Sequence, residues 1–335
     1  MRPFSTSAPG RLCLFGEHQD YLGLPVIAMA MDRRCLLDWA PRPDAQVVVT
    51  SDALGEILRL DLRAGAEKSA AQPMAWVARK LMEVAGVRPS GMNVRVRSDI
   101  PIQAGCSSST ALLTAWVAGF SSVLDFPLTV QDLVQLCHEA EVTACGGAGG
   151  DMDHFACAHG GLHRFGNGDP QVLPAFPGVF VLGDSGEPKD TQGHLARCKE
   201  ARLPLMSNLD TPPAHWSAAQ KSLAEGTRIN RDLEAHWASR MAKGTVDGDE
   251  MGRALTRHHA VLRDVLGLST PRIESMLDAA MGAGAWGGKI NGSGGGGCML
   301  AHVPDSLVDR VIDAICAAGG RGAWAVKLDE GVRHD

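Results

Sequence analysis

The stretch from Gly105 to Ser109, here called the serine loop, has a composition suited to binding an anion. Gly105, Ser107, Ser108 and Ser109 come directly before an apolar run, 110–120, that predicts a buried helix. Unpaired N–H groups at the helix start, with the positive end of the helix dipole behind them, would face a ligand such as the phosphates of ATP. A serine hydroxyl could also ligate Mg2+. The alternative is a serine cap with no ligand.

A second candidate loop, 292–297, contains five glycines and is here called the glycine loop. Its spacing formally matches a dinucleotide fingerprint, but that motif must open a helix, and this loop leads into a predicted strand at 298–303. It is not a Walker A loop, because Ile290 follows Lys289. Glycines permit positive φ and a close approach to a ligand, although a flexible surface loop is the alternative. The candidates for contact with ATP are Gly292, Gly294 and Gly295.

Two acidic residues, Glu141 and Asp153, flank a glycine-rich run at 145–152 that is expected to turn like a hairpin. Asp153 is the candidate to face a reacting hydroxyl, and Arg11, expected at the end of the first strand, would keep it ionised and offset phosphoryl charge. Such a carboxylate is a weak base, but phosphoryl transfer needs mainly alignment and charge compensation. The alternative reading of all three is solvated surface charge.

Four hydrogen-bonding side chains gather in the five residues 17–21. They are Glu17, His18, Asp20 and Tyr21. The vicinal hydroxyls of a sugar need acceptors of this kind, and one carboxylate can accept two hydrogen bonds. The alternative is a polar turn that follows a strand.

Periodicity predicts the elements that must position these groups. Half-buried antiparallel strands are expected at 7–14, 47–50 and 92–97, and helices at 73–85 and 129–144, with Thr129 as N-cap. The second half is more helical. Its expected elements are helices 218–242, 252–265, 272–283 and 305–318, and strands 179–183, 298–303 and 323–326. The glycine- and proline-rich stretch 160–178 suggests a boundary between domains 1–176 and 177–335.

Composition narrows the function classes. The chain has 335 residues, 45% of them hydrophobic, and a net charge of -6, which offers no basic field for nucleic acid and favours a small-molecule partner. Its nine cysteines form no C-x-x-C pair, so reduced buried thiols are expected. The start lacks a signal-peptide pattern and no run is long enough to span a membrane, so a cytoplasmic location is expected.

Three stretches, 8–21, 101–111 and 287–298, with Glu141 and Asp153 between the last two, resemble the GHMP small-molecule kinases. Phe15-Gly-Glu-His-x-Asp-Tyr21 is similar to the galactokinase signature within that family. The resemblance implies an α+β protein with the GHMP kinase fold. Its N-terminal domain would be like ribosomal protein S5 domain 2, its C-terminal domain would be ferredoxin-like, and the active site would lie in the cleft between them.

The resemblance also implies roles for individual residues. Arg11 and Asp153 correspond to a catalytic pair, and Glu141 with one of the serines 107–109, with Ser108 as the candidate, to Mg2+ ligands. Glu17, His18 and Asp20, with Tyr21 in the same motif, correspond to sugar contacts. Trp76 lies on a helix like one that lines the nucleotide site of galactokinases.

Some residues depart from the galactokinase pattern. His154 replaces the usual glutamine, Lys289 and Asn291 are more like mevalonate kinases, and Tyr21 is the only tyrosine, so a second tyrosine contact to sugar is absent. The expected function is ATP- and Mg2+-dependent phosphorylation of the anomeric hydroxyl of galactose or a close relative. Kinases for galacturonate, arabinose or a heptose are alternatives, mevalonate is a weaker one, and a non-catalytic sugar sensor is an alternative of another class. The oligomeric state stays open.

Overall fold

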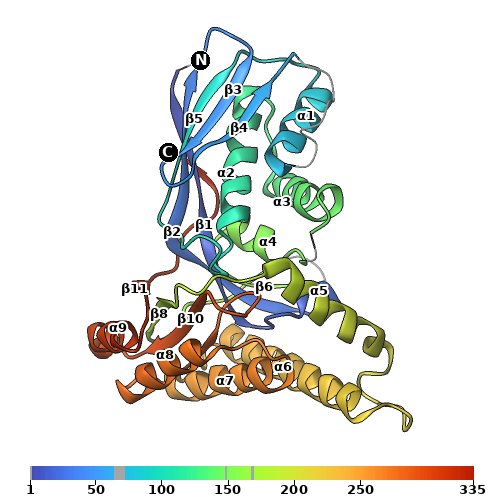
Figure 1. The fold of residues 1–335 in the computed structure, drawn as a ribbon, viewed down its shortest axis with the longest axis vertical. Coiled ribbons are helices and arrows are strands. Elements are labelled where there is room, and N and C mark those ends of the chain that lie inside the picture. The colour runs from blue at the N-terminus through green and yellow to red at the C-terminus, as the bar shows by residue number, and fades with distance from the viewer. Residues whose placement is uncertain (1, 64–71, 148, 167–169) are drawn as a thin grey trace.

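Two β-sheets with helices packed on them make up the structure, which is a computed structural model (Figure 1). It describes residues 2–63, 72–147, 149–166 and 170–335. Residues 148 and 167–169, which belong to the glycine-rich run and the boundary stretch of the sequence analysis, lie outside the described residues, as does Met1. The arrangement matches the expected α+β class.

The larger sheet has the strand order β12-β1-β2-β5-β3-β4, with β6 paired to β2 and β7 paired to β6. Its strands are β1 (Phe4–Phe15), β2 (Val26–Pro41), β3 (Gln46–Ser51), β4 (Gly55–Asp61), β5 (Met92–Ser98), β6 (Leu162–Phe165), β7 (Gln171–Val172) and β12 (Arg333–His334). The expected antiparallel pairing is wrong for one pair, because β3 and β5 run parallel. The chain crosses between them through helix α1, and parallel neighbours require such a crossover.

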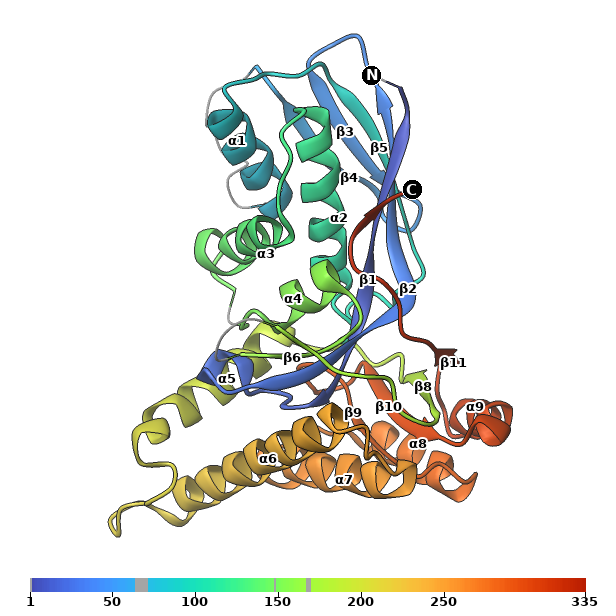
Figure 2. The same ribbon diagram turned by 180° about the vertical axis from the view of Figure 1, so that it is seen from behind.

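Four helices, α1 to α4, cover one face of this sheet (Figures 1 and 2). They are α1 (Pro73–Ala85), α2 (Ser108–Val123), α3 (Val130–His138) and α4 (Met152–His159). Trp116 of α2 lies against Trp39 of β2 with ring centroids 5.1 Å apart, at the centre of the core. The helix expected at 73–85 is confirmed, and α2 is buried nearly all round, as its sequence predicts.

The predicted helix 129–144 forms in two parts. Thr129 caps α3 as expected, since its hydroxyl accepts a hydrogen bond from Asp132 N at 3.1 Å and the Asp132 side chain bonds back to Thr129 N. The last part, Glu139–Ala144, is a π-helical turn. Wider π turns often occur at functional sites, and this one carries Glu141.

The smaller sheet has the order β11-β8-β10-β9 and packs against the last three α-helices of the chain. Its strands are β8 (Val179–Asp184), β9 (Gly287–Ile290), β10 (Cys298–Val303) and β11 (Gly322–Val326). The helices are α5 (Thr191–Arg202), α6 (Ala218–Ala242), α7 (Gly248–Ala260), α8 (Pro271–Gly282) and α9 (Val308–Ala317). The predicted segments 218–242 and 298–303 have the same bounds as α6 and β10, whereas the sequence did not predict α5 and β9.

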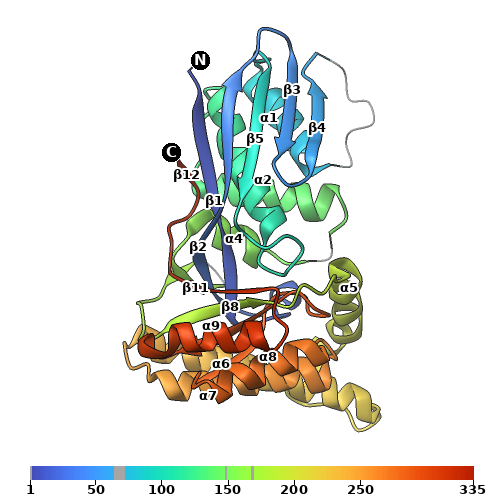
Figure 3. The same ribbon diagram turned by 60° about the vertical axis from the view of Figure 1, so that its left-hand side comes forward.

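The C-terminal segment of the chain lies beside the N-terminal strand. Strand β12 pairs with β1, so the C-terminal residues return to the larger sheet (Figure 3). Along the chain, the strands up to β7 belong to the larger sheet and those from β8 to β11 belong to the smaller one. The division into domains 1–176 and 177–335 stays a prediction, and β12 departs from it because it returns to the larger sheet. Within the described ranges, no helix is long and apolar enough to cross a membrane.

Candidate active site

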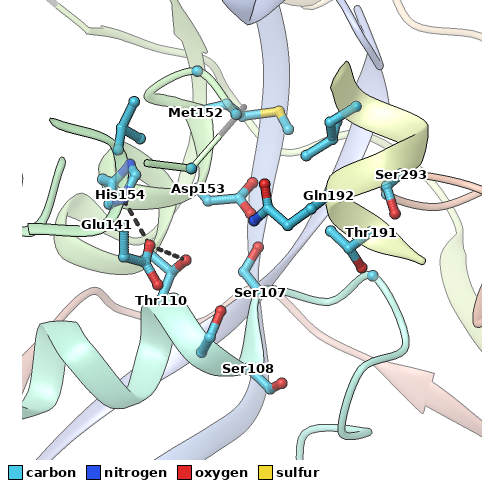
Figure 4. Close-up of a pocket in the computed structure, with 18 of the residues that line it drawn as sticks. Ser107, Ser108, Thr110, Glu141, Met152, Asp153, His154, Thr191, Gln192 and Ser293 are labelled. Carbon is cyan, nitrogen blue, oxygen red and sulfur yellow. Dashed lines mark hydrogen bonds and ion pairs between the residues drawn. The ribbon is translucent and has the colours of Figure 1, made fainter. Parts of the chain in front are cut away.

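One cavity of about 620 Å³ lies where the two sheets meet, and loops from both sides line it (Figure 4). This volume is in the range of small-molecule sites. The predicted residues that line it are Arg11, Glu17, His18, Asp20, Gly105, Ser107, Ser108, Ser109, Glu141, Asp153 and Gly292. The serine loop and the glycine loop, far apart in sequence, therefore open into the same space.

Direct contacts hold these two loops together. The Asn291 side chain accepts a hydrogen bond from Cys13 N at 3.0 Å and donates one to Gly105 O at 2.8 Å. A Cβ on Gly292 would lie 2.6 Å from the Cα of Gly105, closer than side chains approach. Gly292 also has φ +81°, so only glycine fits this contact without strain.

Helix α2 begins at the serine loop without a side-chain cap. Ser107 is the N-cap residue, but its φ of 59° is left-handed and its hydroxyl makes no cap hydrogen bond. The hydroxyl points toward Asp153 instead (Figure 4). The reading of Ser107 as a plain serine cap is therefore wrong, and the first N–H groups of α2 stay available for an anion. A non-glycine residue held in this conformation is a strain typical of functional sites.

Arg11 and Asp153 form an ion pair at the floor of the cavity. Arg11 Nε lies 2.8 Å from Asp153 Oδ1, with Arg11 5% and Asp153 30% exposed, and Arg11 also donates to Gly105 O. Burial by itself raises the pKa of Asp153, but the Arg11 charge and the nearby Ser107 hydroxyl outweigh it, so the pKa lies below its ordinary value. Asp153 is thus an ionised, weakly basic carboxylate that can orient a hydroxyl.

Two expectations about this pair need correction. Arg11 does not lie at the end of the first strand; it lies within β1, where the register with β2 shifts between Pro9 and Arg11. The run before Asp153 is not a hairpin in the part that the structure describes. It leads from the π turn into α4, and Asp153 stands in the first turn of that helix, where the helix dipole favours a carboxylate.

The other end of the cavity carries the motif of residues 17–21. Glu17 is 2% exposed and pairs with the fully buried Lys289, Nζ to Oε2, at 2.7 Å. His18 bonds through Nδ1 to the Tyr21 hydroxyl at 2.8 Å and through Nε2 to Ser293 O at 3.1 Å. Burial and the charge of Arg202 lower the pKa of His18 to about 3, so the ring is neutral.

Asp20 is the carboxylate of this motif that meets the cavity most directly. Burial, followed by the charge of Asp153, raises the pKa of Asp20 to about 6. The loop residue Gly150 packs against it so closely that a Cβ there would lie 2.5 Å from Asp20 Oδ2. This end of the cavity is consequently acidic and rich in acceptors.

Glu141 faces the serine loop from the π turn. Its Oε2 accepts hydrogen bonds from Thr110 Oγ1 and from His154 Nε2, each at 2.9 Å. Carboxylate and hydroxyl oxygens are suitable Mg2+ ligands, so the residues present fit a magnesium ion. Figure 4 shows the Ser108 hydroxyl directed into the cavity, on the side where Thr110 and Glu141 lie.

The residues that line the cavity differ from the predicted site residues in both directions. Trp76 packs on the main hydrophobic core, and neither it nor Tyr21, Gly294 or Gly295 is among the described residues that line the cavity. Sequence reasoning missed Thr110, Lys189, Thr191, Gln192, Leu195 and Ser293, which do line it. Three of these, Thr191, Gln192 and Leu195, come from the start of α5, and Lys189 lies just before that helix. The N-cap Asp190, which accepts from Gly193 N at 2.9 Å, was the available signal.

Models of known families match most of the segments that build this site. Residues 72–161 match the GHMP kinases N terminal domain, 241–321 the GHMP kinases C terminal domain, and 2–41 the galactokinase galactose-binding signature. A mevalonate kinase of Thermococcus onnurineus is 28% identical over 98% of this chain and 97% of that protein. A galactokinase of Streptomyces coelicolor is 29% identical over 93% and 89%.

Solved structures resemble the chain over nearly its whole length. The galactokinase of Lactococcus lactis, crystallised with galactose, superposes with a TM-score of 0.83 at 19% identity and covers 99% of this chain and 95% of its own. The mevalonate kinase of Methanococcus jannaschii gives 0.80 at 16% identity, over 97% and 98%. At these identities, the likeness establishes the fold alone.

Proposed function

This chain belongs to the GHMP kinase family of small-molecule phosphotransferases, and we propose that it transfers the γ-phosphate of ATP to the anomeric hydroxyl of galactose or a closely related neutral sugar. The GHMP kinase fold expected from the sequence is confirmed. The choice of a sugar over other small molecules is the part that we propose, since both mevalonate kinases and galactokinases are among its relatives.

The observation that carries the proposal is that one cavity has two chemically different ends. At one end the uncapped start of α2 and the glycine loop offer backbone N–H groups to phosphates. At the other end Asp20 offers a carboxylate acceptor, and the carboxylate of Asp153 lies between Asp20 and the serine loop. A neutral polyol donates hydroxyl hydrogens to such acceptors, whereas the carboxylate of galacturonate or mevalonate would be repelled by them.

The chain's own groups then divide the work of transfer. Asp153, oriented by Arg11, accepts a hydrogen bond from the attacking hydroxyl and aligns its oxygen with the γ-phosphorus. A bond forms from that oxygen to the γ-phosphorus while the bond from the γ-phosphorus to the bridging oxygen of ADP breaks. The hydroxyl proton leaves late toward Asp153 or solvent, so no strong base is required.

Magnesium would be held by Glu141 together with a serine hydroxyl of the serine loop. When bound, the ion supplies positive charge that neutralises phosphate oxygens. His154 and Thr110 fix the Glu141 carboxylate in place for this role. Which of the serines 107–109 takes part stays a prediction.

A mevalonate kinase is the second candidate, favoured by Lys289 before the glycine loop and by the archaeal relative. A sugar sensor without turnover is the candidate of another class, and the intact Arg11–Asp153 pair argues against it. The test is ADP formation from ATP with galactose, arabinose, galacturonate, a heptose and mevalonate. We expect turnover with a neutral sugar. Turnover with mevalonate alone overturns the sugar assignment, and sugar-dependent ATP binding without ADP favours the sensor.

A further inference from the structure

Lys189, in the segment between β8 and α5, is partly buried and carries a positive charge that forms no ion pair within the described part of the chain. Its Nζ atom is shielded from solvent and has no hydrogen-bond partner among the described residues. Burial lowers the pKa of this lysine, which reflects the cost of keeping an unpaired ammonium group away from water. Unpaired buried charges are expensive, so a partner that arrives with a ligand is the simplest reason for its position.

The position of Lys189 indicates what that ligand is. Its Nζ atom packs against the serine loop, where a Cβ on Gly105 would lie 2.7 Å from it, and the residue lines the cavity. The uncapped start of α2 opens into the same cavity, and so does Ser293, whose buried hydroxyl also lacks a partner among the described residues. Donors from three separate segments thus converge on one place, as an anion site requires.

Neighbouring cations are already occupied. Arg11 donates to Asp153 and to Gly105 O. Lys289 donates to Glu17 and to Cys13 O. Among these three cations, Lys189 is the one that the described residues leave without an acceptor.

We propose that Lys189 binds the γ-phosphate of ATP and remains with the phosphoryl group during its transfer, which makes it a catalytic residue of this site. The inference rests on the proposed kinase function. Arg11 then serves mainly to orient Asp153, and Lys189 compensates the charge on the phosphoryl oxygens as the bond to ADP breaks and the bond to the sugar oxygen forms. A substrate carboxylate is a poorer partner, because the substrate end of the cavity is acidic and Lys189 lies against the serine loop.

Nucleotide binding tests this directly and needs no sugar. The variants are Lys189→Met, Lys189→Arg and, as a matched control on α5, Lys199→Met. Calorimetric titration at fixed Mg2+ compares a non-hydrolysable ATP analogue with ADP. We expect Lys189→Met to weaken the ATP analogue roughly 10- to 100-fold, as loss of a charged hydrogen bond does, with ADP within about threefold. Lys189→Arg should keep most of the preference for the ATP analogue over ADP, and Lys199→Met should keep all of it.

Stability gives a second readout. Removing an unpaired buried charge should leave the melting temperature of ligand-free Lys189→Met unchanged or higher. If Lys189→Met weakens the binding of the ATP analogue and of ADP equally, the role of Lys189 is structural and the inference is overturned. The same holds if the variant has a lower melting temperature but still prefers the ATP analogue over ADP. Weaker binding of an acidic substrate with ATP binding unchanged also overturns it.

Failure of the kinase assignment would look different. If the wild-type protein binds neither nucleotide, the proposed function falls and this inference falls with it. If the wild type binds ATP but no sugar of the panel is phosphorylated, a preference for ATP over ADP that depends on Lys189 still supports the lysine's role while the sugar assignment fails.

Discussion

Asp153 should be indispensable for turnover and dispensable for nucleotide binding, because it faces the hydroxyl and not the serine loop's N–H groups. We expect Asp153→Asn to lower kcat at least about 100-fold, since it removes the charge that aligns the acceptor, and to leave ATP affinity within a few-fold. Steady-state kinetics and titration of ATP measure both. Asp151→Asn is the control, a neighbouring carboxylate that is not among the described residues lining the cavity. A near-normal kcat for Asp153→Asn would contradict the assignment.

The Asp20 carboxylate should lower the stability of the folded protein at neutral pH and strengthen the binding of sugar. Its pKa of about 6 in the folded protein lies above its ordinary value of 3.8. The folded state therefore holds the proton more tightly, and this contribution to stability is complete below pH 3.8 and is lost as the pH rises through 6. The loss amounts to at most about 3 kcal/mol.

The variant Asp20→Asn isolates this effect. We expect it to be more stable than the wild type at pH 7 and nearly equal at pH 4, as urea unfolding at the two pH values would show. Its sugar KM should rise by the equivalent of roughly 1.5–3 kcal/mol, because a charged hydrogen-bond acceptor is lost. Taking the difference from wild type cancels other groups, such as the buried His18. A stability difference that does not change with pH would rule out the raised pKa.

The meeting of the glycine loop and the serine loop depends on one glycine. Gly292→Ala places a methyl group 2.6 Å from the Cα of Gly105, so one of the loops must move. Gly267→Ala is a matched control, because Gly267 also has a left-handed φ, of 64°, but open space around its missing side chain.

The control should cost roughly 1–2 kcal/mol of stability from the left-handed conformation and leave ATP binding unchanged. Gly292→Ala should cost more and weaken ATP binding by roughly tenfold or more, an effect of the size of about 1.4 kcal/mol. Unfolding curves and ATP titrations of the two variants separate the contributions. If Gly292→Ala and Gly267→Ala lose the same stability and both bind ATP like the wild type, the contact between the two loops does not shape the nucleotide site.

The two halves of the molecule are joined by the buried pair of Lys289 on β9 and Glu17 after β1. Lys289→Met leaves Glu17 charged and unpaired in the interior, which should cost about 3–5 kcal/mol of unfolding free energy. The double variant Lys289→Met with Glu17→Gln should recover part of that loss, because the unpaired charge is gone. Urea unfolding of the single and double variants measures this. A loss below about 1 kcal/mol in the single variant would show that Glu17 finds another partner or takes up a proton.

Local patterns were sufficient for much of the fold. The helices 73–85 and 218–242 and the strand 298–303 follow from periodicity and end signals that lie within each segment. The parallel pairing of β3 with β5 was missed, because pairing direction depends on how distant segments pack. Helix α5 was missed because its sequence has almost no apolar face, and residues at its start line the cavity instead of packing in the core.

The sequence alone was enough to predict the serine loop, the glycine loop and the acidic residues as parts of a phosphoryl-transfer site, since glycine, serine and carboxylate chemistry is local to each motif. Only the tertiary structure decided that Arg11 is engaged by Asp153, that Glu17 is paired with Lys289, and that the shielded Nζ atom of Lys189 has no partner among the described residues. The physical reason is that a charge acquires its role from its neighbours and its burial, and segments as far as 272 residues apart supply both here.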